Sequence, residues 1–113
     1  MTMRYDVTGS GQTLLLVHGV VHRRQAWNPV LDLLTPYRRV VTVDLLGHGE
    51  SAELDLTAPD PLALLVDGLS DLLTEFETPD QRVHVAGNSL GGWLALALAC
   101  RGRVASATAL SPA

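Results

Sequence analysis

The stretch Arg82-Val83-His84-Val85-Ala86-Gly87-Asn88-Ser89-Leu90-Gly91-Gly92 decides how this sequence folds. Its first five residues are typical of a buried β-strand, and the apolar run from Leu90 to Cys100 is typical of a helix. Ser89 lies at the junction, with Gly87 and Gly91 two residues away on either side. A strand-to-helix turn this tight crowds its neighbours and exposes a serine hydroxyl, so the stretch predicts a nucleophilic serine.

Two other interpretations of this turn stay open. An ordinary glycine-rich connection would look the same, and a helix N-terminus behind glycines can also cradle a phosphate. The turn lacks the Lys-Ser/Thr pair of a P-loop, which weighs against the phosphate site. If Ser89 is a nucleophile, the N–H of Leu90 at the start of the helix is placed to bind an oxyanion.

Strands and helices alternate outward from this turn. Strands are predicted at residues 4–7, 13–17, 39–43, 82–86 and 104–110, and helices at residues 24–34, from 61 to about 77, and at 90–100. Such alternation requires a mostly parallel sheet with helices on both faces, which is the α/β class. Residues 1–113 are enough for one domain and too few for two.

Composition excludes several classes of protein. Apolar residues make up 47% of the 113, as in a globular domain, and the net charge of −4 leaves no basic stripe for nucleic acid. No apolar run approaches the roughly 20 residues of a membrane span, and residues 1–7 lack the apolar segment of a signal peptide. A single cysteine, Cys100, cannot form an intrachain disulfide and is expected to be buried. A reducing, cytoplasmic location is therefore predicted.

Polar, glycine-rich clusters follow three of the predicted strands. They are His18-Gly19, the stretch from Asp44 to Ser51, and the stretch from Gly87 to Gly92. Because ligands bind at the carboxyl ends of strands in parallel sheets, these clusters are expected to meet at one edge.

These motifs, in this order, resemble the α/β-hydrolase superfamily of the serine hydrolase type, over nearly the whole chain; Trp27 also fits. The resemblance implies that Ser89 is the nucleophile and that the N–H groups of Leu90 and Val20 form the oxyanion hole. It implies loop-shaping roles for His18, Gly19, Asp44, Gly47 and Gly49, beside Gly87 and Gly91 in the nucleophile turn. It implies no cofactor and no metal. Two departures are visible: Leu46 stands where the family often has Pro, and Val20 to Arg24 replace small residues.

The same resemblance implies that residues 1–113 form an incomplete core without the C-terminal strands and lid. The family order is Ser, then Asp or Glu, then His, and no His follows Ser89 in this sequence. Among His18, His22, His48 and His84, only His18 is near enough to act as a stand-in base. We therefore expect the chain alone to be nearly inactive.

Three functions are compatible with the sequence. The first is a serine hydrolase fragment acting on a small-molecule ester, thioester, lactone or carbon–carbon bond and needing a C-terminal half. The second is a non-catalytic α/β module or pseudoenzyme that dimerises through the open edge at residues 104–110. The third is a small flavodoxin-like nucleotide binder, although the chain supplies no evident phosphate contacts.

Overall fold

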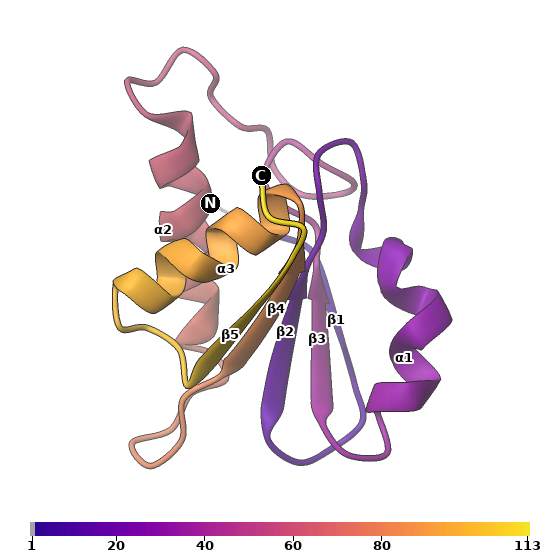
Figure 1. The fold of residues 1–113 in the computed structure, drawn as a ribbon. Helices are drawn as coiled ribbons and strands as arrows, with labels where there is room; N and C mark the ends of the chain where they lie inside the picture. The colour runs from indigo at the N-terminus through magenta and orange to yellow at the C-terminus, as the bar shows by residue number, and fades with distance from the viewer. Residues whose placement is uncertain (1) are drawn as a thin grey trace.

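The structure, a computed structural model, describes residues 2–113 and contains a five-stranded sheet in the order β1-β3-β2-β4-β5 (Figure 1). The strands are β1 (Tyr5–Thr8), β2 (Thr13–Val17), β3 (Arg39–Val43), β4 (His84–Asn88) and β5 (Ser106–Leu110). Strand β1 runs antiparallel to β3, whereas every other neighbouring pair is parallel. The predicted α/β class with a mostly parallel sheet is confirmed.

Helices cover the two faces of the sheet unequally. A 3₁₀ turn (Arg24–Trp27) leads into the short helix α1 (Asn28–Leu34) on one face, while α2 (Pro61–Leu73) and α3 (Leu90–Cys100) lie together on the other (Figure 1). Helix α2 starts where the sequence indicates, because the Asp60 side chain accepts the Ala63 N–H at 3.1 Å and Pro61 occupies the first turn.

The main core lies between the sheet and the α2–α3 layer. Strands β2 and β3 are almost wholly buried, as expected for central strands of a parallel sheet. Their inward side chains pack with those of β4 and the two helices, including Leu15, Val17, Val41, Val43, Val85, Leu69, Leu94 and Leu98. Among residues 2–113, no helix is both long and apolar enough to cross a membrane.

Around β5, one face of the sheet is not covered by a helix among residues 2–113. Strand β5 pairs only with β4 among the described residues, and its side chains Ser106, Thr108 and Leu110 are exposed. Helix α1 lies over the β2–β3 side of this face and buries no residue fully (Figure 1). The core is therefore incomplete, as predicted.

Some local predictions were wrong. Strand β4 runs to Asn88 because Gly87 and Asn88 still pair with β5, so no loop separates it from Ser89. His84 lies in β4, within the predicted strand; it is half-buried, and its Nδ1 lies 2.7 Å from Ser106 Oγ on the uncovered face. Cys100 is exposed instead of buried, because two residues beyond Leu98 it lies on the far side of α3.

Candidate active site

Ser89 connects β4 directly to α3 in a backbone conformation that a non-glycine residue rarely adopts. Its φ is 56° and its ψ is −115°, a conformation that costs on the order of 1–3 kcal/mol. Hydrogen bonds hold it there: Ser89 N–H donates to the Leu110 carbonyl at 3.0 Å, and the Ser89 carbonyl accepts from Trp93 N–H at 3.1 Å. The hydroxyl itself caps nothing on the helix. The fold therefore fixes the backbone of Ser89 and leaves its hydroxyl available.

The two flanking glycines are required by close packing of backbone against backbone. A side chain at Gly87 would overlap the carbonyl of Gly91, and one at Gly91 would overlap the carbonyl of Val17 at the end of β2. Neither obstacle is a flexible side chain that could move aside. The sequence pattern therefore has a steric cause in the structure: helix α3 starts almost in contact with the end of the central strand.

The loop after β2 approaches Ser89 from the other side. A side chain at Gly19 would lie 3.3 Å from Ser89 Cβ, so only glycine gives this spacing without a shift. Within residues 2–113, no hydrogen-bond acceptor is found for the N–H of Val20 or for the N–H of Leu90. Both donors therefore lack an acceptor among the described residues, one in the loop after β2 and one at the start of α3.

Asp44 follows β3 and is fully buried, with its carboxylate enclosed by donors. Oδ1 accepts Arg24 N–H at 2.6 Å, while Oδ2 accepts Arg24 Nη1 at 2.5 Å and Glu50 N–H at 2.9 Å. Burial works to raise the pKa of Asp44, but these hydrogen bonds outweigh it and hold the pKa below its usual range. Gly49 is needed here, since a side chain at that position would overlap the Asp44 carboxylate; Gly47 also has a positive φ of 79°.

His18 is buried at the end of β2 and uses both of its ring nitrogens. Nε2 accepts the N–H of Leu45 at 3.1 Å, so the proton of the neutral ring is on Nδ1, which donates to the Gly19 carbonyl at 2.7 Å. Desolvation lowers the pKa of His18, which favours this neutral form. Neither nitrogen is free to take a proton from Ser89, so the structure does not support His18 as a stand-in base.

Arg24 is a functional candidate that the sequence reading did not single out. It is buried, and its guanidinium bonds Asp44, Asp6 at 2.7 Å and Glu50 at 2.9 Å. The signal that could have found it is Asp44, because a buried carboxylate is commonly paired with a cation, although the sequence alone does not say which of its eight arginines is the partner.

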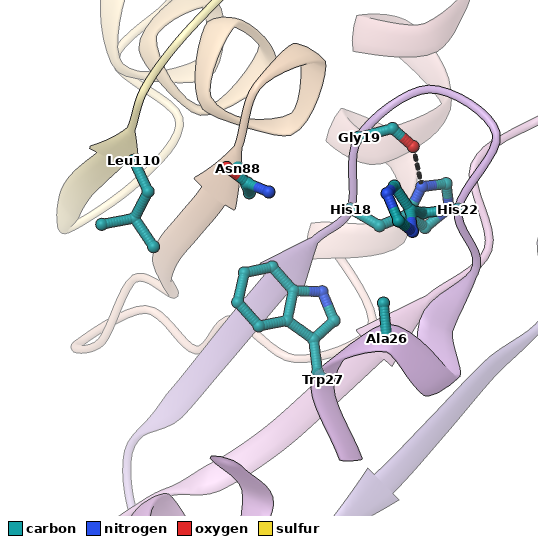
Figure 2. A pocket seen from close by; sticks show the side chains of 7 residues that line it. All are labelled: His18, Gly19, His22, Ala26, Trp27, Asn88 and Leu110. Atoms are coloured by element: carbon teal, nitrogen blue, oxygen red, sulfur yellow. Dashed lines mark hydrogen bonds between the residues drawn. The ribbon is translucent and has the colours of Figure 1, made fainter. Parts of the chain in front are cut away.

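A pocket of about 410 Å³ lies beside the Ser89 turn on the side of α1. Figure 2 shows Trp27 and Ala26 on one wall, Asn88 and Leu110 on another, and His18 with His22 beyond them. Ser89 does not line this pocket, although its neighbour Asn88 does. Over residues 2–113, no group of three or more His, Cys, Asp or Glu side chains is arranged to hold a metal ion.

Comparison with known proteins gives a consistent result. The model of the alpha/beta hydrolase family matches residues 14–113. An uncharacterized protein of Mycobacterium bovis is 36% identical over 95 residues, covering 84% of this chain and 27% of its own length. The pimeloyl-[acyl-carrier protein] methyl ester esterase of Nitrosomonas europaea is 33% identical over 98 residues, covering 87% of this chain and 35% of its own length.

Solved structures agree with the sequence relatives. A thermophilic esterase from Thermogutta terrifontis superposes with a TM-score of 0.78 at 30% identity, over 92% of this chain and 37% of that chain. The present chain thus spans about a third of the length of the proteins it matches.

Proposed function

The chain belongs to the alpha/beta hydrolase family, and we propose that residues 1–113 carry the nucleophile and the oxyanion hole of a serine hydrolase. The observation that carries the proposal is the Ser89 turn, whose backbone is held at a φ of 56° while its hydroxyl caps nothing. Strain of this kind persists where the surrounding structure enforces it, and it is concentrated at functional sites.

In the proposed reaction, Ser89 Oγ attacks the carbonyl carbon of a small acyl substrate. The carbonyl oxygen becomes an oxyanion, which the N–H groups of Leu90 and Val20 bind. The general base takes the Ser89 hydroxyl proton and passes it to the alcohol or thiol, which departs as its C–O or C–S bond breaks and the acyl-enzyme forms. Water, deprotonated by the same base, then attacks the acyl carbon, and the acid is released as Ser89 takes the proton back. These two donors suit the role because they lack an acceptor within residues 2–113. No hydrogen bond inside the protein has to break before they bind the oxyanion.

The general base and its carboxylate partner are proposed to come from outside residues 1–113. No histidine follows Ser89 in the sequence, and both nitrogens of His18 are engaged. Without a base, Ser89 stays a weak nucleophile, so these residues alone are expected to be nearly inactive. A segment that continues this chain, or a partner, would supply the missing groups.

The substrate class is proposed as ester, thioester or a related acyl bond. A relative is a methyl ester esterase, and a thioesterase domain from the curacin biosynthetic pathway has a TM-score of 0.77 at 30% identity. A serine nucleophile fits these reactions, since it forms the acyl-enzyme that they pass through. No cofactor is needed for this chemistry.

A second candidate is a non-catalytic module that pairs with a copy of itself. The exposed strand β5 favours it, since its side chains Ser106, Thr108 and Leu110 include no charge to discourage pairing. This candidate predicts a stable dimer in sedimentation and no reaction at Ser89.

Completion of the fold tests the proposal. Residues 1–113 are joined to the part of the Nitrosomonas europaea esterase that follows its matching segment, giving what we call the completed protein. We expect it to hydrolyse p-nitrophenyl acetate, and Ser89→Ala to lower turnover by up to about a millionfold, to the background rate. A folded completed protein without Ser89-dependent turnover would contradict the proposal.

A further inference from the structure

We propose that Arg24 is a positioning residue for the oxyanion loop, defined here as residues 19–23, which carries the Val20 N–H. The inference rests on the proposed function, because it concerns how one donor of the proposed oxyanion hole is held opposite Ser89. Arg24 touches no substrate in this proposal. It acts by fixing the end of the loop.

The oxyanion loop is attached at both ends to the segment that follows β3. At its beginning, His18 Nε2 accepts the N–H of Leu45 at 3.1 Å, and His18 Nδ1 donates to the Gly19 carbonyl. At its end, the backbone N–H and guanidinium of Arg24 both bond the Asp44 carboxylate, at 2.6 and 2.5 Å. Asp44 and Leu45 are adjacent, so one short stretch of chain determines where the loop starts and finishes.

The two anchors differ in what they depend on. The His18 anchor is a pair of neutral hydrogen bonds inside a buried site. The Arg24 anchor gathers three carboxylates, those of Asp6, Asp44 and Glu50, onto one guanidinium that is 7% exposed. Among residues 2–113, no other cation pairs with any of the three. Loss of the guanidinium therefore leaves the Asp44 charge with two backbone N–H donors only.

Packing does not hold the loop between these anchors. Val20 is 56% exposed and Val21 is 91% exposed, so almost nothing covers the tip of the loop. Val21 also has a φ of 60°, which is unfavourable for a β-branched residue. One hydrogen bond lies inside the loop, from His22 N–H to the Gly19 carbonyl at 3.2 Å, so the position of the loop against Ser89 depends mainly on its two anchored ends. Since Gly19 abuts Ser89, a shift at the Arg24 end moves the Val20 N–H relative to the nucleophile.

Steady-state kinetics of the completed protein test this role, with Arg103 as a matched control. Arg103 also holds a half-buried network, to Ser70 and Glu77, but it follows α3 at the opposite end of the strands. We expect Arg24→Met to lower kcat by roughly 100-fold with little change in KM, because a misplacement of about 1 Å at the reacting centre has that effect. Arg24→Lys should restore part of the loss, whereas Arg103→Met should lower Tm and leave kcat unchanged.

A second measurement uses residues 1–113 themselves. Arg24→Met should speed amide hydrogen exchange at His22 and at position 24, whose N–H groups donate to the Gly19 carbonyl and the Asp44 carboxylate, more than in the core strands, and Arg103→Met should not. If Arg24→Met does not fold, the double variant Asp6→Asn/Glu50→Gln removes two of the three pairs and keeps Asp44. A smaller fall in kcat is then expected.

The outcomes separate the inference from the proposed function. A completed protein with native Arg24 that folds but shows no turnover contradicts the proposed function, and the inference falls with it. An active completed protein whose folded Arg24→Met, or double variant, keeps the native kcat overturns the inference alone. Equal losses of kcat in Arg24→Met and Arg103→Met also overturn it, because they would report general destabilisation.

Discussion

Two clusters of polar groups lie at the same edge of the sheet and are built in opposite ways. Around Asp44, the carboxylate accepts three donors and the neighbouring His18 uses both nitrogens. Around Ser89, the backbone is strained, and the Leu90 and Val20 N–H groups find no acceptor within residues 2–113. Polar groups whose hydrogen bonds are all made within the protein hold the loops in place. Polar groups that lack a partner beside a strained backbone are available to a ligand. The difference separates the scaffold of the site from its proposed chemistry.

Gly91→Ala should have the largest effect on stability, because it disrupts the contact between the start of α3 and the end of β2 that holds the Ser89 turn. The new methyl group would overlap the Val17 carbonyl, which is part of a central strand. We expect the free energy of unfolding of the completed protein to fall by more than about 4 kcal/mol in urea denaturation. Gly102→Ala is the control: nothing lies near its added methyl, so only its φ of 67° opposes it, by about 1 kcal/mol. Equal losses would refute the steric account of the turn.

Asp44→Asn tests whether the other cluster is a scaffold. The substitution leaves the buried Arg24 guanidinium without its fully buried partner charge, so the free energy of unfolding should fall by roughly 3 kcal/mol. Asp67→Asn breaks the exposed pair with Arg101 and should lower it by less than about 1 kcal/mol. Urea denaturation of both variants at pH 7 gives the comparison. Similar values for the two would mean that the Asp44 cluster contributes little.

The pH dependence of the free energy of unfolding tests whether His18, in the same cluster, is buried in its neutral form. Burial lowers the pKa of His18 below its ordinary 6.5, so the unfolded chain binds more protons than the folded one near that pH. Stability is therefore fully present above pH 6.5 and should fall as the pH drops below it, by at most about 1.4 kcal/mol per pH unit. His18→Gln should remove this dependence, and His22→Gln, at an exposed position, should keep it. Denaturant titrations of both variants between pH 7 and 5 measure this difference in pH dependence.

Ser89→Gly should have the smallest effect and the opposite sign. Glycine adopts a positive φ without strain, so the free energy of unfolding should rise by about 1 kcal/mol. Ser89→Ala keeps the strain and should change stability very little, which makes it the matched control. A gain with glycine would show that the Ser89 cluster stores strain. Loss of stability in Ser89→Gly would contradict that view.

The fold was largely predictable because its signals are local. The buried runs 13–17 and 39–43 and the helix at 90–100 have the predicted bounds, since apolar periodicity and glycine or proline boundaries settle them. The burial of residues at the edge of the core was harder to predict. Cys100 is an example, because its helix is apolar throughout but only one of its sides is covered. Whether a helix face is covered depends on distant segments, which no local pattern describes.

The candidate site was predictable in its motifs and not in its connections. The Ser89 turn and the positions of His18 and Asp44 could be read from spacing, because each follows a predicted strand directly. The part played by Arg24 could not, since its partners Asp6, Asp44 and Glu50 are brought to it by strand order and loop shape. Likewise, the engagement of both His18 nitrogens emerges only from the three-dimensional arrangement.

Labelling with a fluorophosphonate, followed by mass-spectrometric mapping of the modified residue, tests most directly whether the Ser89 turn is the reactive centre. In the completed protein, the reagent should attach to Ser89 alone and turnover should cease in step with the labelling. The Ser89→Ala variant should remain unlabelled. Attachment to another serine, or ester hydrolysis that persists in Ser89→Ala, would contradict the assignment of this turn as the nucleophile.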